Sequence, residues 1–317
     1  MREPRFSLRQ LAYFICVAEQ GTVAGAAGVL RISASAVSDA IRDLELELGS
    51  PLLLRRKGQR AALTPTGAEM LPQARALLAA ASDLRSNLHG TGDAISGHLI
   101  VGCMSTLAPF LLPRLMSEYQ RLHPGVDLDF VEGSQIEVQE HLYDGRCEVA
   151  ILYDDGNLAS RFTREKLYDV IPRIILSAGH RLAKSPTIRL QDLADEPFIM
   201  TNVLPSREFT KVIFQRTGIT PKVRHATGNF ELARAMVARG CGYSIMVQTP
   251  ESEFSYEGLP LVARPIADLD FSIAVTLCRW TNIKPGRQLQ AFADICHQMF
   301  DAGGPGARPA SIDSPTA

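Results

Sequence analysis

The sequence predicts a multidomain protein of the α and α/β classes: a small helical head, a long linker helix and a two-lobed α/β body. Three observations support this prediction. The chain has 317 residues, more than one domain usually holds, and 46% of them are hydrophobic, enough for several cores. Helical periodicity dominates the first 90 residues. From residue 97 onward, strand-like and helix-like segments alternate.

Two helices are expected to open the head. Apolar residues recur at helical spacing over residues 8–20, and Gly21 ends the run. Thr22 belongs to the residue types that cap helix N-termini, so a second short helix should follow it. The small residues of that second helix would let another helix approach closely.

A third helix is expected to start at Ser33 or Ser35, both of which can cap it, and to stop at Gly49. Its buried stripe has spacings of four, three and four: Val37, Ile41, Leu44 and Leu48. The opposite face carries short hydrogen-bonding side chains and one cation, which suit base edges and phosphates. Acidic residues such as Glu45 lie toward the far end and should point away from phosphates. The candidate DNA-contacting residues here are Thr22, Ser33, Ser35, Ala36, Ser38, Asp39 and Arg42.

Three consecutive cations follow a short strand that is expected at residues 52–54. Arg55, Arg56 and Lys57 would lie in a wing and contact backbone phosphates, which gives affinity and register without sequence choice. Residues 1–63 hold nine Lys and Arg against six Asp and Glu, although the whole chain has a net charge of −1. The segment therefore predicts a winged helix-turn-helix that binds double-stranded DNA.

Residues 8–71 resemble the winged helix-turn-helix of LysR-type transcriptional regulators. The resemblance rests on an ordered set of positions: Leu8, Leu11, Phe14, Ala26, Ala27, Ser38, Ile41, Leu44, Glu45, Leu48, Gly49, Leu52, Arg55, Leu63, Thr64 and Gly67. The chain departs from the family pattern at Ala34, Ser35, Asp39 and Leu54, so the family's operator preference does not carry over. We expect the DNA-binding head to span residues 7–64.

A long helix is expected after Thr64, because a capping residue type is followed there by Pro65, which suits the first helical position. Apolar residues then alternate at spacings of four and three, as in a coiled-coil seam: Met70, Ala74, Leu77, Ala81, Leu84 and Leu88. Residues 65–90 therefore predict a dimerisation helix, with packing against the same chain as the alternative.

A dimer would hold two heads against one face of the duplex, so we expect an interrupted inverted repeat as its target. The resemblance to LysR-type regulators leaves dimer and tetramer open. It also makes RNA polymerase a further candidate partner.

The body is expected to span residues 95–302. A β-α-β-α-β order over residues 98–154 and a similar set from residue 170 favour two lobes with mostly parallel sheets. This order resembles the type 2 periplasmic-binding-protein-like effector domain of LysR-type regulators. Residues 303–317 are rich in Gly, Pro and Ser and are expected to be a disordered tail.

Ligands of open α/β sheets bind beyond the carboxyl ends of strands, close to helix N-termini. Polar residues at four such places predict a site for a small anionic effector, with a carboxylate as the first candidate. Arg207 would be its bidentate partner, and Tyr153 and Asp154 would line the cleft or its hinge. For each residue, a plain helix-capping role is the alternative. The candidate effector-binding residues are Ser105, Thr106, Ser134, Gln135, Ser206, Arg207, Thr227 and Asn229.

Signals for other function classes are missing from the sequence. There is no nucleophile elbow, phosphate-binding loop or His-Glu-x-x-His motif, so we expect neither an enzyme nor a cofactor. The six Cys form no Cys-x-x-Cys pair, which favours buried thiols over a metal or redox site. A solute-binding protein with the same two lobes is the alternative, but it would need an export signal. The amino terminus lacks one and no apolar run could span a membrane, so a cytoplasmic protein is expected.

Overall fold

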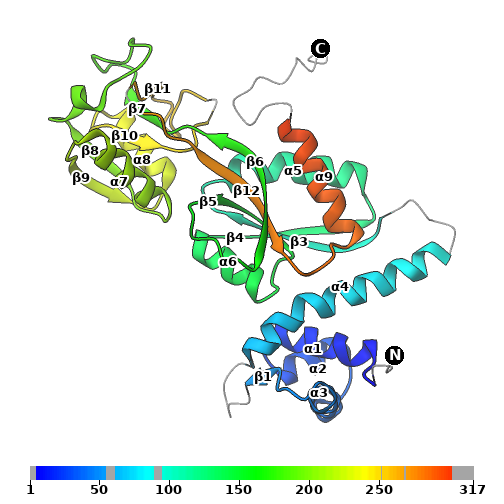
Figure 1. The fold of residues 1–317 in the computed structure, drawn as a ribbon. Helices are drawn as coiled ribbons and strands as arrows, with labels where there is room; N and C mark the ends of the chain where they lie inside the picture. Colours follow the sequence, from blue (N-terminus) through cyan, green and yellow to red (C-terminus); the bar gives the residue numbers. More distant parts are fainter. Residues whose placement is uncertain (1–4, 55–60, 89–94, 251, 268, 302–317) are drawn as a thin grey trace.

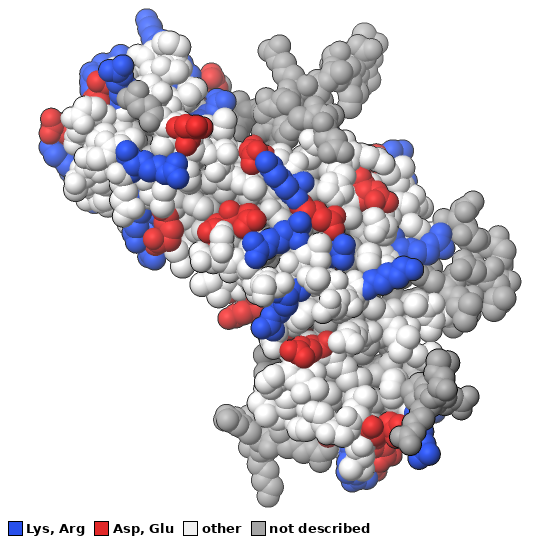
Figure 2. All heavy atoms as spheres, viewed as in Figure 1, with Lys and Arg blue, Asp and Glu red and all other residues white. Residues whose placement is uncertain are grey.

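The computed structural model describes residues 5–54, 61–88, 95–250, 252–267 and 269–301. Figure 1 shows a helical head, a long helix and a body of two lobes in chain order. The cations expected in the wing and the tail expected to be disordered (303–317) lie outside the described residues. The face of the body in Figure 2 mixes Lys and Arg with Asp and Glu, in keeping with the small net charge.

Three helices and a two-stranded ribbon form the head. They are α1 (Leu8–Gln20), α2 (Val23–Leu30), α3 (Ala34–Leu48) and the antiparallel strands β1 (Leu53–Leu54) and β2 (Ala62–Leu63). The side chains of Ser7, Thr22 and Ser33 cap the helices, and Gly49 ends α3 in the left-handed conformation. The predicted helix boundaries are confirmed, with Ser33 and not Ser35 as the cap of α3.

The core of the head lies between these helices and the first turns of α4 (Pro65–Leu88). Phe14 of α1 and Val37 and Leu44 of α3 are completely buried there. The buried stripe predicted for α3 is wrong at its last position, because Leu48 is 36% exposed at the end of the helix. The periodicity of a helix does not show where along its length the packing against neighbouring elements ends.

Helix α4 begins as predicted. The Thr64 hydroxyl accepts a hydrogen bond from the Gly67 amide at 2.9 Å, and Pro65 is the first helical residue. The same hydroxyl donates to the Pro51 carbonyl at 2.7 Å, which joins the start of α4 to the segment just before β1.

The seam expected on α4 has two parts: its first residues pack against the head, and its middle residues are exposed. Ala74 is only 3% exposed and lies in the core of the head, with Met70 packed against that core. The alternative of packing against the same chain therefore holds for these first turns, and Ala74 is removed from the seam as a correction. Leu77 is 45% exposed and Ala81 is partly exposed. The side chains of the last two seam residues, Leu84 and Leu88, lie outside the described residues.

Lobe 1 is built on a five-stranded sheet with the order β4–β3–β5–β12–β6. Its strands are β3 (Gly97–Met104), β4 (Val126–Gly133), β5 (Val149–Asp154), β6 (Phe162–Val170) and β12 (Ile273–Trp280). Its helices are α5 (Ala108–Leu122), α6 (Gln135–Tyr143) and α9 (Arg287–Asp301). β3 pairs in parallel with β4 and β5, whereas β12 runs antiparallel between β5 and β6.

Lobe 2 combines the antiparallel order β10–β7–β11 with the parallel pair β8–β9, and a bridge between Phe198 and Tyr243 joins them. Its strands are β7 (Arg173–Ser177), β8 (Pro197–Thr201), β9 (Lys222–Thr227), β10 (Ser244–Met246) and β11 (Leu261–Pro265). Its helices are α7 (Ser206–Thr217), α8 (Phe230–Ala238) and the short η1 (Leu190–Leu193).

The chain passes between the lobes twice, from β6 to β7 and from β11 to β12 (Figure 1). The prediction of mostly parallel sheets is wrong, because β6 and β11 pair antiparallel with β12 and β7. Neither β6 nor β11 was expected from the sequence. The prediction of two α/β lobes is confirmed.

Candidate functional site

The exposed face of α3 carries the central group of residues that were expected to contact DNA. Ser35, Ala36, Ser38, Asp39 and Arg42 are all exposed, opposite the buried residues of the helix. Arg42 Nη2 lies 2.8 Å from Asp39 Oδ1, and both side chains are more than half exposed. Such a pair contributes about 1 kcal/mol or less, so a phosphate oxygen can replace Asp39 as the partner of Arg42 at little cost.

Thr22 and Ser33 lie at the N-termini of α2 and α3. Thr22 Oγ1 accepts a hydrogen bond from the Gly25 amide at 2.9 Å, and Ser33 Oγ accepts one from the Ala36 amide at 3.1 Å. Their hydroxyls therefore serve as helix caps. Since both residues are exposed, the adjacent helix N-termini remain accessible to a phosphate.

Glu45 has a role that the sequence analysis missed. Its Oε1 accepts hydrogen bonds from the backbone amides of Leu52 at 2.8 Å and Leu53 at 3.1 Å. The carboxylate thereby fixes the start of the ribbon to α3. The residues after α3 carried no local signal for this long-range contact.

We predict that Glu45→Ala lowers the free energy of unfolding of the head by about 2 kcal/mol, because hydrogen bonds to a charged acceptor contribute about 1.5–3 kcal/mol. Glu45→Gln keeps an acceptor and should lose less. Urea denaturation followed by circular dichroism measures both changes. Asp43→Ala, at an exposed position of α3, is the control. Equal stability of Glu45→Ala and Asp43→Ala would contradict the assigned contact.

A small cavity lies between the two lobes. Its volume is about 10 Å³, which is room for about one water molecule. Its lining comes from both lobes: Thr106, Tyr153, Thr201, Ser206, Phe230, Ile245, Met246, Val247 and Gln248. The lobes are thus closed around this space.

Two hydroxyl groups in this cavity are buried without a partner at hydrogen-bonding distance and angle: Tyr153 Oη and Thr201 Oγ1. Tyr153 is 0% exposed and Thr201 is 4% exposed. A buried polar group without a hydrogen bond costs about 1–3 kcal/mol. Burial raises the pKa of Tyr153, so the hydroxyl keeps its proton. Hydrogen-bonding contacts with the side chains of Thr106 and Gln248, too long or too bent to meet the criteria for a full hydrogen bond, lower this pKa in part.

Contacts between aromatic rings hold the lobes together beside the cavity. Tyr153 of β5 meets Phe209 of α7 edge to face, with ring centroids 5.7 Å apart. Phe110 of α5 meets Phe230 of α8 in the same manner at 6.0 Å. Any change in the angle between the lobes must therefore disturb the surroundings of Tyr153.

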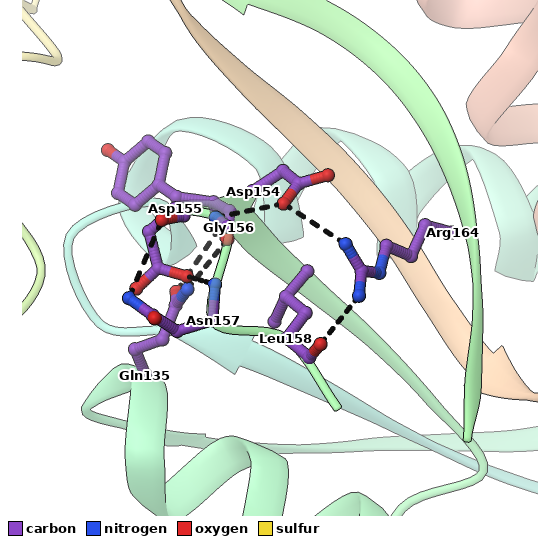
Figure 3. Close-up of polar contacts among 8 residues, drawn as sticks. Gln135, Asp154, Asp155, Gly156, Asn157, Leu158 and Arg164 are labelled. Atoms are coloured by element: carbon purple, nitrogen blue, oxygen red, sulfur yellow. Dashed lines mark hydrogen bonds and ion pairs between the residues drawn. The ribbon is translucent and has the colours of Figure 1, made fainter. Parts of the chain in front are cut away.

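Gln135 positions Tyr153. Its Nε2 donates to the Tyr153 carbonyl at 2.6 Å, and its Oε1 accepts from the Tyr153 amide at 3.2 Å (Figure 3). In the same view, Asp154, the last residue of β5, pairs with Arg164 at 3.5 Å. These contacts correct the predicted role of Gln135, because its amide is engaged by the backbone of β5 and does not line the cavity.

Thr106 and Ser206 are the two predicted effector-binding residues that line the cavity. Ser134 and Asn229 instead cap α6 and α8. The Ser134 hydroxyl accepts from the Glu137 amide at 3.3 Å, and Asn229 Oδ1 accepts from the Leu232 amide at 2.9 Å. The capping alternative therefore holds for this pair.

Three further predicted residues lie outside the cavity lining. Arg207 pairs with Glu208 at 3.0 Å and its side chain is 40% exposed, so it is not the partner of a ligand in this cavity. The Thr227 hydroxyl accepts a hydrogen bond from the Asn229 amide at 3.1 Å. Ser105 donates its backbone amide to the carbonyl of Gly133 at 2.8 Å.

Thr201 and Gln248 line the cavity but were not predicted. Thr201 is the last residue of β8, so it obeys the rule that polar residues at the carboxyl ends of strands meet ligands. That signal was available in the sequence. Gln248 follows a strand of only three residues and carried no comparable signal.

A groove of about 790 Å³ adjoins the cavity and shares Val247 and Gln248 with it. Arg114 and Arg173 line the groove, are exposed, and form no ion pair with another described residue. A third cation of the lining, Arg234, donates to the carbonyls of Ser252 and Phe254 and is committed to the fold. The groove therefore offers two guanidinium groups to an anion, although the carboxylates of Asp169, which pairs with Lys166 at 2.6 Å, and Glu253 also line it.

The prediction of buried thiols holds for five of the six Cys. All six Cys are free, and Cys241 alone is exposed. Burial raises the pKa of Cys103, Cys147 and Cys296, and it raises the pKa of Cys278 to about 12. Since the thiolate is the reactive form, these four side chains are poor nucleophiles.

Two further kinds of site are absent from the described ranges. No three His, Cys, Asp or Glu side chains gather there in a way that could hold a metal ion. None of the helices there combines the length and apolar character that crossing a bilayer requires.

Two family models match the chain. The model described as the LysR substrate binding domain matches residues 92–301. The model described as the bacterial regulatory helix-turn-helix protein, lysR family, matches residues 8–68. Together they cover both the head and the two-lobed body.

Named relatives agree with these matches. The HTH-type transcriptional regulator IlvY of Escherichia coli is 28% identical over 75% of this chain and 81% of its own length. The crystal structure of HinK, a LysR family transcriptional regulator from Pseudomonas aeruginosa, is 32% identical, has a TM-score of 0.62, and covers 93% of this chain and 98% of its own. The effector binding domain of QuiR in complex with shikimate, 19% identical with a TM-score of 0.58, covers 66% of this chain and 99% of its own and shows the fold alone.

Proposed function

The chain belongs to the LysR family of bacterial transcriptional regulators, and we propose that a small anionic effector, bound between its lobes, controls how its head binds DNA. Members of this family are transcriptional regulators and not enzymes, and they bind DNA and small-molecule effectors. One observation carries the proposal for this chain: two buried hydroxyls, of Tyr153 and Thr201, lack partners inside a cavity that both lobes line.

The chemistry of the cavity and its groove favours a carboxylate as the effector. The Tyr153 and Thr201 hydroxyls can donate to carboxylate oxygens, and Thr106, Ser206 and the Gln248 amide add further polar groups. In the adjoining groove, the free guanidinium groups supply positive charge. Shikimate, named in the complex of QuiR, is also a carboxylate.

Binding would have to change the angle between the lobes, because the closed cavity has room for about one water molecule. A carboxylate can accept hydrogen bonds from Tyr153 and Thr201 in only one arrangement of the lobes, and there it removes the cost of the two unpaired hydroxyls. The effector therefore has a higher affinity for that arrangement than for the other. The effector shifts the equilibrium by that difference in affinity, and about 1.4 kcal/mol changes the population ratio tenfold.

At the DNA, we propose that α3 enters the major groove with Ser35, Ser38 and Arg42 toward base edges. Thr22, Ser33 and the cations at residues 55–57 would contact phosphates. We keep the division into a head (7–64), a linker helix (65–90), a body (95–302) and a tail (303–317). Two heads joined as a homodimer or within a tetramer would bind an interrupted inverted repeat in the cytoplasm, where RNA polymerase is a candidate partner.

We predict that Arg42→Ala and Arg55→Ala weaken operator binding in different ways. Arg42→Ala, which removes a proposed base contact, should cost about 1–3 kcal/mol and relax sequence preference. Arg55→Ala, which removes a proposed phosphate contact, should weaken binding to all sequences alike and lower the salt slope by about 1. Fluorescence anisotropy across a salt series measures both. Arg216→Ala, in lobe 2, is the control. Unchanged affinity in both variants would rule out the proposed interface.

We predict that Leu77→Glu shifts the chain toward monomer and abolishes binding to the paired half-sites. Leu77 is exposed on the seam, and a buried charge at an interface without a partner is strongly unfavourable. Sedimentation velocity measures the assembly state. Gln73→Glu, also exposed on α4 but off the seam, is the matched control. A wild-type chain that is monomeric at every concentration would refute the dimer.

Thermal-shift measurements of the full chain with a panel of small carboxylates test the effector site. A ligand that binds the folded state raises the melting temperature as its concentration rises. Thr201→Ala and Ser206→Ala should remove the shift, whereas Ser134→Ala, which alters a helix cap outside the cavity, should keep it. A shift that survives in both cavity variants would place the ligand elsewhere.

A further inference from the structure

The head contacts lobe 1 of the same chain beside the first turns of α4, which runs between the two (Figure 1). Two hollows, of about 860 Å³ and about 260 Å³, flank this contact, and each is lined by residues of both the head and lobe 1. Four residues line both hollows: Glu19, Arg75, His98 and Ile100. The contact between the head and lobe 1 therefore lies among these residues, with open space on either side.

Arg75 lies between two carboxylates that come from different parts of the chain. Its Nη2 is 2.7 Å from Oε1 of Glu19 in α1. Its Nη1 is buried and makes no hydrogen bond, and Oε1 of Glu148 lies within ion-pair range at 3.9 Å. The side chains of Arg75 and Glu148 are 12% and 26% exposed, so water and salt screen their attraction less than that of a surface pair. One guanidinium group thus joins a carboxylate of the head to a carboxylate of lobe 1.

Glu148 is fixed to the sheet of lobe 1. Its Oε2 accepts a hydrogen bond from the Ile100 amide at 3.1 Å, and its own amide donates to the Ile100 carbonyl at 3.1 Å. Burial raises the pKa of Glu148, whereas the charge of Arg75 and the hydrogen bond from Ile100 lower it in part. Loss of Arg75 would leave a buried carboxylate without its cation, which is strongly unfavourable.

A glycine beside this ion pair lets α4 approach lobe 1. Gly145 lies just after α6 and has a φ of +64°. A Cβ there would be 3.0 Å from Leu71 Cδ2 and 3.6 Å from Arg75 Nη1. Leu71 is 1% exposed and belongs to the core of the head. The turn after α6 therefore packs directly against α4 and adds an apolar contact to the ion pair.

We propose that Arg75 is a positioning residue, which through Glu148 holds the head against lobe 1 of the same chain and so sets the orientation of α3 relative to the body. The proposal does not rest on the proposed effector. Glu148 directly precedes β5, the strand that carries Tyr153 of the interlobe cavity near its other end. At about 3.3 Å per residue, the two residues lie about 17 Å apart along this strand.

Distances between two spin labels, measured by pulsed electron paramagnetic resonance on the full chain without effector, test this role. Cys241→Ser removes the exposed thiol, and the labels are attached at Val29→Cys in α2 and Ser117→Cys in α5, two exposed positions. An excess of unlabelled chain keeps labelled chains apart in an oligomer. We expect a single narrow distance distribution, which Arg75→Ala and Glu148→Gln should each replace by a broad one.

Arg146→Ala is the matched control, because it removes an exposed cation from the same turn whose ion pair with Asp144, at 3.9 Å, does not involve the head. It should keep the narrow distribution. Circular dichroism shows whether each variant is folded. Glu148→Gln lies outside the head and keeps an acceptor for the Ile100 amide, so it tests the contact even should Arg75→Ala unfold the head.

The double variant Arg75→Ala with Glu148→Gln should broaden the distribution no further than either single variant, since both remove the same contact. A broad distribution without either substitution, a narrow one in folded Glu148→Gln, or a broad one in Arg146→Ala would each overturn the proposal. Any of these results would leave the proposed effector site standing, because no effector is present in the measurement.

Discussion

We expect Gly67→Ala to unfold the head and abolish DNA binding, while the body should stay folded. Gly67 lies in the first turn of α4, and a Cβ there would sit 2.1 Å from the Leu52 carbonyl oxygen and 3.0 Å from its carbon. The obstacle is backbone, and it is held by a 2.9 Å hydrogen bond from the Thr64 amide. Either α4 or the ribbon must move, at a cost of about 3 kcal/mol or more.

Urea denaturation of the full chain, followed by circular dichroism, measures this loss as an early transition of the head. Gly28→Ala is a matched control, because a Cβ at that helical position meets nothing within 4 Å. This control should be neutral, or more stable by up to about 1 kcal/mol. Equal stability of the Gly67→Ala variant and the wild type would show that α4 and the ribbon are not in contact as described.

Tyr153→Phe should make the body more stable and the effector response weaker. The variant removes a buried hydroxyl that has no partner, which relieves a cost of about 1–3 kcal/mol. The same hydroxyl is the proposed donor to the effector, and hydrogen bonds to charged groups contribute about 1.5–3 kcal/mol. We therefore expect a higher melting temperature without ligand and an affinity for the carboxylate reduced by at least about tenfold.

Tyr119→Phe separates this result from a general effect of the substitution. Tyr119 is equally buried, but its hydroxyl donates to the Gln288 carbonyl at 2.9 Å. Its loss should destabilise the body by about 1 kcal/mol and leave the effector response intact. Were both variants to lose stability, the Tyr153 hydroxyl would have a partner in the folded chain, and the basis of the proposed site would be removed.

The head was largely predictable because its signals are local. Capping residues and glycines stand next to the helix ends that they determine, so Ser33 and Gly49 could be placed from sequence alone. The predicted burial of Leu48 and the predicted seam position of Ala74 were wrong for the same physical reason. Whether an apolar side chain is covered depends on a neighbouring element, and periodicity does not identify that element.

The body was predictable in class but not in pairing. The sequence of β6 carries charged residues at several positions, so it does not have the apolar character of a central strand. β6 forms because β12, more than 100 residues later, lies beside it. Contacts of such long range leave no mark in a short window of sequence.

The effector site was predicted in part, because the rule that led to it is necessary but not sufficient. Thr106, Ser206, Ser134 and Asn229 all lie near the ends of strands, yet only Thr106 and Ser206 face the cavity. Which of them meet depends on how the two lobes close, and contacts such as Tyr153 with Phe209 determine that closure. The local sequence cannot tell a helix cap from a ligand-binding hydroxyl.

The position of β12 determines the order in which the protein can mature on the ribosome. Lobe 2 is an insertion within lobe 1, and the sheet of lobe 1 lacks the strand between β5 and β6 until residue 280 has been synthesised. The head, which needs only the first 80 or so residues, can fold during translation. A nascent chain can therefore complete the fold of its head well before lobe 1, and with it the proposed effector site, is complete.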